Sequence, residues 1–322
     1  MNNLRDDIII GSRGSQLALW QSEWVKNSLQ KIFPKLTITI TTIATTGDKI
    51  LDSPLAKIGD KGLFTKELEL ALLDKRVDLA VHSLKDVPTK LPEGLTLAAI
   101  TTREDVRDVF IAHPNKNYKH LDDVGQGGTI ATGSLRRRSQ LLSWRPDLKI
   151  IDLRGNLNTR FAKLDASGWD GMILAHAGVL RLGFETRVTE ILPIDHMLPA
   201  VGQGALAIEC RSDDHDLIRI LQQLASTATT HATTGERALL RRLEGGCQVP
   251  IGTYGRIENN VFHLDAVVGS LDGKKIVRAK IHGTPEQSEA LGTQLAEILL
   301  NSGAKEILEQ IRQTDNKETP AI

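Results

Sequence analysis

Two successive parts of this 322-residue chain repeat the same alternation of short apolar strands and amphipathic helices. In the first part an apolar run at residues 8–10 ends in a Gly-Ser turn, and apolar residues then recur at helical spacing up to Pro34. β-Branched residues at 37–45 indicate the next strand, and a helix over 64–73 precedes a further strand over 78–82. Strands that alternate with helices at this spacing predict βαβ units and a largely parallel sheet.

The pattern begins again near residue 103. Strands are expected over 129–132, 149–153 and 172–175, and helices over 135–144, 157–164 and 176–182. The segment Val201-Gly202-Gln203-Gly204 then forms a glycine hinge, and the apolar run at 205–209 is a strand that can return to the first sheet.

The last part of the chain has a different pattern. Alternating segments at 252–257, 261–268 and 274–281 are separated by Asn-Asn and Asp-Gly turns, which predicts an antiparallel meander. Amphipathic helices follow over 285–301 and 305–311. We therefore expect an α/β protein with two α/β domains and a small α+β C-terminal domain. The domain boundaries are predicted at residues 1–102 together with 200–224, at 103–199 and at 225–322.

Composition excludes several classes of function. Forty basic residues balance forty acidic ones and aromatic residues are 4% of the chain, so no net charge favours nucleic acid or a membrane surface. Two cysteines and nine histidines provide neither a disulfide framework nor a cysteine-rich metal site. The charged residues 1–7 lead into a strand without the apolar core of a signal peptide, and no apolar run is long enough to span a membrane. We expect a soluble, cytoplasmic protein without a metal.

Cys247 stands on a glycine-flanked turn. A helical pattern over 236–242 ends at Gly245-Gly246, and Pro250 keeps the following chain extended. A thiol on such a turn can be presented to a ligand. Free cysteine is also among the most buried residue types, and Cys210 in an apolar strand is expected to be inert. The local pattern around Cys247 leaves both interpretations open.

Arginine recurs where predicted strands pass into helices. In α/β sheets, ligands bind in crevices at the ends of the strands. The N-terminus of a helix at such a strand end offers N–H groups to an anion, and an arginine there adds a forked donor for a carboxylate or a phosphate. The residues at these junctions are Arg13 and Ser15, then Ser134, Arg136, Arg137 and Arg138, then Arg154, Asn156 and Arg160. A single junction with arginines could be explained as ordinary surface charge, but several such junctions favour an anion-binding cleft.

Lys85-Asp86 follows the strand at 78–82 and places one carboxylate among these cations. Such a carboxylate can stabilise a cationic intermediate or accept an N–H, although an ion pair that orders the turn is nearly as good an interpretation. His82 lies on the strand itself and is interpreted as structural.

Residues 49–62 show no clear period, contain glycine and proline breaks, and carry lysines at 49, 57 and 61. We expect a mobile loop that brings Lys57 and Lys61 towards the anion site.

Seven sequence blocks, taken together and in order, resemble the porphobilinogen deaminase (hydroxymethylbilane synthase) family. They are Gly47-Asp48, Lys61-Gly62-Leu63-Phe64, His82-Ser83-Leu84-Lys85-Asp86-Val87-Pro88, Ser134-Leu135-Arg136-Arg137, Leu153-Arg154-Gly155-Asn156, Val201-Gly202-Gln203-Gly204-Ala205 and Glu244-Gly245-Gly246-Cys247-Gln248-Val249-Pro250.

The resemblance implies an enzyme of tetrapyrrole biosynthesis that joins four porphobilinogen molecules head to tail and releases ammonia at each addition. It implies a dipyrromethane cofactor held by a thioether to Cys247, on which the linear tetrapyrrole grows before water releases it. The implied fold is two α/β domains like those of type-two periplasmic binding proteins, with a small third domain that bears the cysteine. The implied oligomeric state is a monomer.

The resemblance also implies residue roles. Asp86 matches the catalytic aspartate, which stabilises the positive charge of the azafulvene left when ammonia departs. The implied cofactor-binding residues are Cys247, Lys85, Ser134, Arg136, Arg137, Arg154 and Arg160. The implied substrate-binding residues are Arg13, Ser15, Arg154 and Arg160, and the implied lid residues are Lys57, Lys61 and Phe64. His176 replaces a usually small residue, and its role is left open.

Two other classes remain as alternatives. A two-domain protein that closes on a small anion would need no Cys247, and a thiol hydrolase would need a histidine base near it, which no motif supplies. The intact mass of the purified protein separates these classes from the enzyme.

Overall fold

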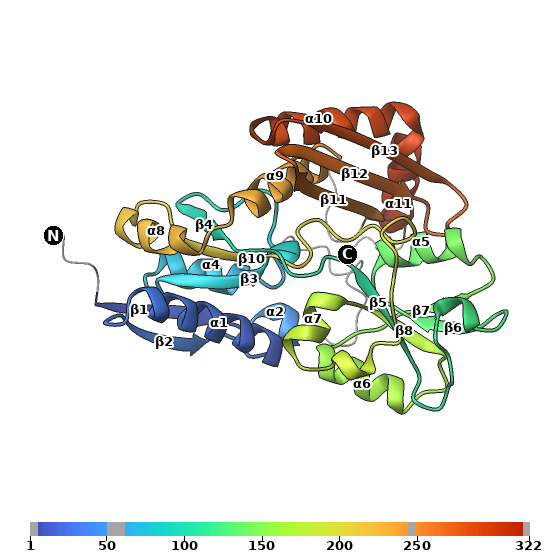
Figure 1. The fold of residues 1–322 in the computed structure, drawn as a ribbon, viewed down its shortest axis with the longest axis horizontal. Helices are drawn as coiled ribbons and strands as arrows, with labels where there is room; N and C mark the ends of the chain where they lie inside the picture. Colours follow the sequence, from blue (N-terminus) through green and yellow to red (C-terminus); the bar gives the residue numbers. More distant parts are fainter. Residues whose placement is uncertain (1–5, 50–61, 244–248, 318–322) are drawn as a thin grey trace. The chain divides into compact units, whose positions relative to one another are not determined.

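The computed structural model describes residues 6–49, 62–243 and 249–317 (Figure 1). These residues divide into two compact units. The first contains residues 6–49, 62–104 and 204–230, and the second contains 105–203, 231–243 and 249–317. The three-domain boundaries expected from the sequence stay a prediction.

The first unit is built on a five-stranded sheet with the order β2-β1-β3-β10-β4. Its strands are β1 (Asp7–Ser12), β2 (Thr37–Thr42), β3 (Leu79–Ser83), β4 (Leu95–Ile100) and β10 (Leu206–Arg211). Strand β1 runs parallel to β2 and β3, whereas β10 runs antiparallel to both β3 and β4. The expected return of this strand to the first sheet is confirmed. The expectation of a largely parallel sheet is confirmed apart from β10, because β4 is antiparallel to β10 and so runs in the same direction as β1, β2 and β3. Strand β10 belongs to no βαβ unit, and its direction is not set by a crossover.

Helices cover both faces of this sheet. The helices of the unit are α1 (Gln16–Ile32), α2 (Thr46–Lys49), α4 (Lys66–Leu73) and α8 (His215–Leu221). Val25 and Leu29 of α1 pack in one buried cluster with Ile8 and Ile10. Leu68 of α4 packs in another cluster, with Ala80. Because alternate residues of a strand point to opposite faces, α1 and α4 lie on opposite faces of the sheet.

The second unit contains a five-stranded sheet with the order β7-β6-β8-β5-β9. Its strands are β5 (Asp108–Ala112), β6 (Thr129–Ala131), β7 (Lys149–Ile151), β8 (Gly171–Ala175) and β9 (Glu190–Ile191), and its helices are α5 (Leu135–Trp144), α6 (Leu157–Asp165) and α7 (His176–Arg181). Strand β6 is parallel to β7 and β8, and β5 is antiparallel to β8 and β9. The strand directions therefore repeat those of the first sheet, although the antiparallel strand is the last in chain order in the first sheet (β10) and the first in the second (β5).

The second unit also contains a three-stranded antiparallel meander of β11 (Ile251–Glu258), β12 (Val261–Gly269) and β13 (Ile276–Gly283). Asn259 and Asn260 form the first turn with φ of 50° and 61°, angles that asparagine tolerates better than most residues. The core beside the meander includes Leu239 of α9 (Thr227–Arg242), Leu295 of α10 (Ser288–Leu299) and Ile307 of α11 (Lys305–Lys317). Two repeated α/β sheets and a smaller α+β part confirm the expected fold class.

Several elements differ from the sequence expectations. The short strands β4, β5 and β9 and helix α8 were not predicted, and β2 ends at Thr42, three residues early. Lys49, expected at the start of a loop, ends the short helix α2. In the described part of the chain no helix has the length and apolarity needed to cross a bilayer.

Candidate active site

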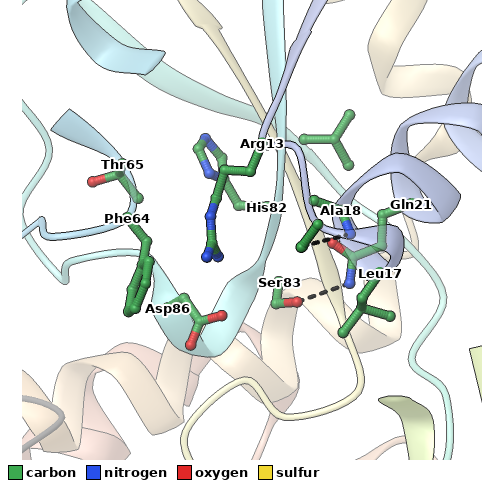
Figure 2. A pocket seen from close by; sticks show the side chains of 11 residues that line it. Arg13, Leu17, Ala18, Gln21, Phe64, Thr65, His82, Ser83 and Asp86 are labelled. Atoms are coloured by element: carbon green, nitrogen blue, oxygen red, sulfur yellow. Dashed lines mark hydrogen bonds between the residues drawn. The ribbon is translucent and has the colours of Figure 1, made fainter. Parts of the chain in front are cut away.

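A small open pocket of about 60 Å³ lies beyond the carboxyl ends of β1 and β3 in the first unit. Its lining residues are Arg13, Ser15, Leu17, Ala18, Gln21, Phe64, Thr65, Val81, His82, Ser83 and Asp86. Figure 2 shows the side chains of Arg13, Phe64 and Asp86 pointing into the same space. The structure therefore brings together four residues that the sequence marked separately, Arg13, Ser15, Phe64 and Asp86.

Arg13 is held by an aromatic contact. Its guanidinium carbon lies 4.2 Å from the centre of the Phe64 ring, within the range of a cation–π interaction. The Phe64 ring in turn packs against Gly47, where an added Cβ would lie 2.3 Å from the ring. Because no side chain fits at position 47, Gly47 sets how closely the ring and the arginine approach the sheet.

Ser15 caps a helix with its hydroxyl and also lines the pocket. Its hydroxyl oxygen accepts the N–H of Ala18 at 3.3 Å and so caps helix α1. A hydroxyl that accepts through its oxygen can still donate its own hydrogen to a carboxylate. Gln21, one turn further along α1, donates to the Ser83 hydroxyl at 2.8 Å. Gln21 and Ser83 were not singled out from the sequence, although a glutamine on the apolar face of a helix was a usable signal.

Asp86 is half-buried at the end of a short 3₁₀ turn that directly follows β3. The Leu84 N–H donates to the Ala205 carbonyl at 3.0 Å, and the Val87 N–H donates to the Leu84 carbonyl at 3.1 Å. These backbone bonds hold the turn in place, so the position of Asp86 does not require an ion pair with Lys85. Lys85 is half-buried beside it.

His82 is also a lining residue of this pocket, and its interpretation as a structural residue stays a prediction. The Nε2 of His82 lies 2.9 Å from Oε2 of Glu209 on the neighbouring strand β10. Glu209 was not singled out from the sequence, because a pairing between residues so far apart in the chain has no local signal.

Arg136 and Arg137 lie in the second unit and share one buried carboxylate. Arg136 Nη1 donates to Asp108 Oδ2 at 2.6 Å, and Arg137 Nη2 donates to Asp108 Oδ1 at 2.8 Å. Burial would raise the pKa of Asp108, but the two guanidiniums hold it well below its usual range. Ser134, also marked from the sequence, accepts the Arg137 N–H at 3.4 Å and caps helix α5. The role of both arginines as cofactor ligands stays a prediction.

Arg154 and Arg160 lie at the junction between β7 and α6. Arg154 Nε is 3.5 Å from Asp152 Oδ2, and burial lowers the pKa of this guanidinium. Arg160 Nε donates to the Gly155 carbonyl at 2.8 Å, and Gly155 itself has φ of 110°, which favours glycine. Asn156 caps α6 by accepting the Thr159 N–H at 2.9 Å. The arginines thus lie at a strand-to-helix junction, as the sequence predicted.

His176 pairs with an acidic partner. Its Nδ1 lies 3.0 Å from Asp105 Oδ2, and the same carboxylate accepts from Arg107 Nη2 at 2.6 Å. Burial acts to raise the pKa of Asp105, but hydrogen bonds from Arg107 and His176 lower it to about 2. A charged partner explains how this position accommodates a histidine.

Cys247, Lys57 and Lys61 lie outside the described residues, so the thioether and the lid stay predictions. Cys210 is fully buried in β10, and burial raises the pKa of its thiol to about 12. The expectation that Cys210 is buried in a strand is confirmed, and its inertness stays a prediction.

The fold and the pocket define an α/β protein that presents arginines, helix caps and one carboxylate at the carboxyl ends of its strands. Residues 8–219 match the family model described as porphobilinogen deaminase, dipyromethane cofactor binding domain, and residues 230–301 match the model of the family's C-terminal domain. The chain belongs to the porphobilinogen deaminase family.

Full-length relatives agree with this assignment. The porphobilinogen deaminase of Chlorobaculum tepidum is 55% identical over 314 residues, which cover 97% of this chain and 100% of that protein. That of Carboxydothermus hydrogenoformans is 52% identical and covers 98% of this chain and 100% of its own length.

Solved structures of binding proteins show a weaker likeness. The methionine binding protein MetQ has a TM-score of 0.44 and 13% identity, covering 68% of this chain and 89% of its own. The unliganded L-cystine solute receptor of Neisseria gonorrhoeae has a TM-score of 0.40 and 13% identity, covering 74% of this chain and 92% of its own.

Proposed function

We propose that this chain is a transferase that joins four porphobilinogen molecules head to tail into the linear tetrapyrrole hydroxymethylbilane, with release of ammonia at each addition. The observation that carries the proposal is that Asp86, Arg13 and Ser15 line one pocket in a chain of this family.

Substrate binding uses cationic and hydroxyl donors, of which Arg13 and Ser15 line the pocket. Each porphobilinogen carries an acetate and a propionate, and a guanidinium offers a forked donor to such groups. Arg13 and the Ser15 hydroxyl supply these donors in the first unit, and Arg154 and Arg160 supply them in the second. The Phe64 ring orients the Arg13 guanidinium before substrate arrives, so less conformational entropy is lost on binding.

Asp86 provides the charge for the chemical step. When the aminomethyl C–N bond breaks, positive charge spreads over the pyrrole and its N–H, and a carboxylate already in place stabilises that charge. Preorganised charge of this kind typically contributes a factor of about 100–1,000 in rate. The turn that carries Asp86 is fixed by backbone hydrogen bonds, which is the preorganisation the mechanism needs.

The family's dipyrromethane cofactor, when bound, supplies the terminal pyrrole to which the first substrate is joined. We propose that Cys247 holds it by a thioether and that Lys85, Ser134, Arg136, Arg137, Arg154 and Arg160 bind its carboxylates. The described donors fit a polycarboxylate, because the buried Nε–H of Arg136 has no hydrogen-bond partner among the described residues and remains available to a further acceptor.

The test is incubation of the purified protein with porphobilinogen, followed by measurement of ammonia and of the tetrapyrrole product. Four ammonia molecules per hydroxymethylbilane are expected. Failure to consume porphobilinogen would overturn the proposal, and so would ammonia release that yields no linear tetrapyrrole.

We also propose that the protein acts in the cytoplasm as a monomer, which is supported by its balanced charge and by the family resemblance. Light scattering on the purified protein would reject the monomer if it gave a multiple of 35.3 kDa.

A further inference from the structure

Three buried ionisable side chains meet between helix α4 and the sheet of the first unit. His82 is 5% exposed, Glu209 is 0% exposed and Glu69 of α4 is 8% exposed. His82 and Glu209 share the sheet face of Ala80, which is the face that α4 covers. Burying three such groups together is costly unless they are paired. The role proposed for the pocket so far uses none of them.

The pairing within this cluster fixes one ring nitrogen of His82. Nε2 lies 2.9 Å from Glu209 Oε2, and no hydrogen bond to Nδ1 is present among the described residues. A carboxylate at one ring nitrogen favours the tautomer in which that nitrogen carries the proton. The neutral imidazole then keeps the lone pair of Nδ1 as an acceptor. A carboxylate in this position also stabilises the imidazolium that forms when Nδ1 takes a proton.

Glu69 does not compete for this role. Burial raises the pKa of Glu69, and the charge of Glu209 acts in the same direction. Glu69 is therefore shifted towards its protonated, neutral form, and Glu209 is the acid within hydrogen-bond distance of the imidazole. The second oxygens of both acids, Oε1 of Glu69 and Oε1 of Glu209, lack a hydrogen-bond partner among the described residues.

Of the three residues in this cluster, His82 is the one that lines the pocket of Arg13 and Asp86. It thus connects a fully buried carboxylate with the space in which the proposed chemistry takes place. Buried polar groups usually find partners within the fold, whereas no described residue bonds Nδ1 of His82.

We propose that His82, held by Glu209, is the base that accepts the ring proton released at each addition. The inference rests on the proposed function. The C–N bond of the substrate ammonium group breaks first, and its electron pair leaves with ammonia. A bond then forms between the exocyclic methylene carbon and the α carbon of the terminal pyrrole. The α C–H bond breaks last, its electrons restore the aromatic ring and its proton moves to Nδ1 of His82. The imidazolium returns the proton to solvent, so each addition releases ammonia and one proton.

The test uses porphobilinogen that carries deuterium at its free α position, because this deuterium is lost when the next unit is added. In His82→Gln we expect chain growth to slow on the order of 100-fold, the usual contribution of a general base. Ammonia release in the first turnover should stay within about twofold of wild type, because that step precedes proton loss. The isotope effect on chain growth should rise above the wild-type value.

Two further variants separate a base from a structural role. Glu209→Gln keeps the shape of the side chain, and we expect it to slow chain growth and to raise the isotope effect less than His82→Gln does. This variant tests the proposal even if His82→Gln does not fold. His113→Gln removes another buried histidine, 6% exposed and in the second unit, and should leave the isotope effect unchanged. Equal slowing of ammonia release and chain growth, with no change in the isotope effect, would overturn the proposal.

A measurement independent of turnover examines the tautomer. ¹⁵N NMR of histidine-labelled protein should show His82 protonated at Nε2 and not at Nδ1, and Glu209→Gln should weaken that preference. A proton on Nδ1 in the wild type would contradict the proposal. Because wild-type ammonia release is measured in the same series, a protein that does not consume porphobilinogen would reject the proposed function instead.

Discussion

The guanidinium of Arg13 stacks 4.2 Å above the ring of Phe64, and the ring rests directly on the backbone of Gly47. The main cation of the pocket is thus positioned by a residue without charge. Three sequence motifs that lie far apart in the chain, around residues 13, 47 and 64, act as one structural unit.

Replacing Phe64 by Leu should weaken substrate binding with little change in stability. The substitution keeps an apolar side chain against Gly47 but removes the aromatic face, a contact worth about 0.5–2 kcal/mol. We expect KM for porphobilinogen to rise about threefold to thirtyfold while kcat falls less. Tyr254→Leu is the control, since it removes a cation–π contact with Arg256 outside the pocket. Steady-state kinetics that show the same change in both variants would contradict the assignment.

Replacing Asp86 by Asn should abolish most of the activity without unfolding the protein. The substitution keeps the size of the side chain and loses its charge, so single-turnover ammonia release should fall about 100–1,000-fold, or roughly 3–4 kcal/mol. Asp74→Asn, at an exposed position after α4, is the matched control and should remain active. An Asp86→Asn protein that melts early yet turns over normally when folded would remove Asp86 from the mechanism.

The buried ion cluster of the second unit should contribute to stability as well as to cofactor binding. Asp108→Asn leaves Arg136 and Arg137 without their shared carboxylate and should lower the free energy of unfolding by about 3–5 kcal/mol. The same substitution at Asp216, which pairs with Arg219 at the surface, should cost about 0–1 kcal/mol. Urea unfolding measures both values. Equal losses would show that the buried cluster contributes no more than a surface pair.

The pair of Asp105 and His176 predicts a defined pH dependence of stability. The pKa of Asp105 is lowered from 3.8 to about 2, so its contribution to stability is complete above the ordinary aspartate range and is lost as pH falls through about 2. The difference in free energy of unfolding between wild type and Asp105→Asn should be largest near neutral pH and should shrink as pH falls from about 4 to about 2. A difference that stays constant over this range would contradict the lowered pKa.

Local patterns predicted the helices of both α/β sheets well. Helix α5 was expected over residues 135–144 and is found there, because an N-cap serine precedes the apolar period and a proline follows its end. The direction of β10 and the existence of β4 and β5 could not be predicted in the same way. These strands are joined by long-range pairings, and their residues carry no signal of the partner they pair with.

The same contrast between local patterns and long-range pairing explains why only part of the candidate site was predicted. Arg13, Ser15 and Asp86 stand at strand ends, where the βαβ pattern already places ligands. Glu209 becomes relevant because β10 returns beside β3, which no local pattern shows. Asp108 was missed similarly, because its partners Arg136 and Arg137 are brought to it by the pairing of β5 with β8.

The measurement that most directly tests the account is the intact mass of the wild-type protein, purified from cells that supply porphobilinogen, beside that of Cys247→Ser. The wild type should exceed the mass of its sequence by one dipyrromethane, and the variant should show the bare sequence mass. A wild-type protein with the bare sequence mass would contradict the account, as would an adduct that survives in Cys247→Ser.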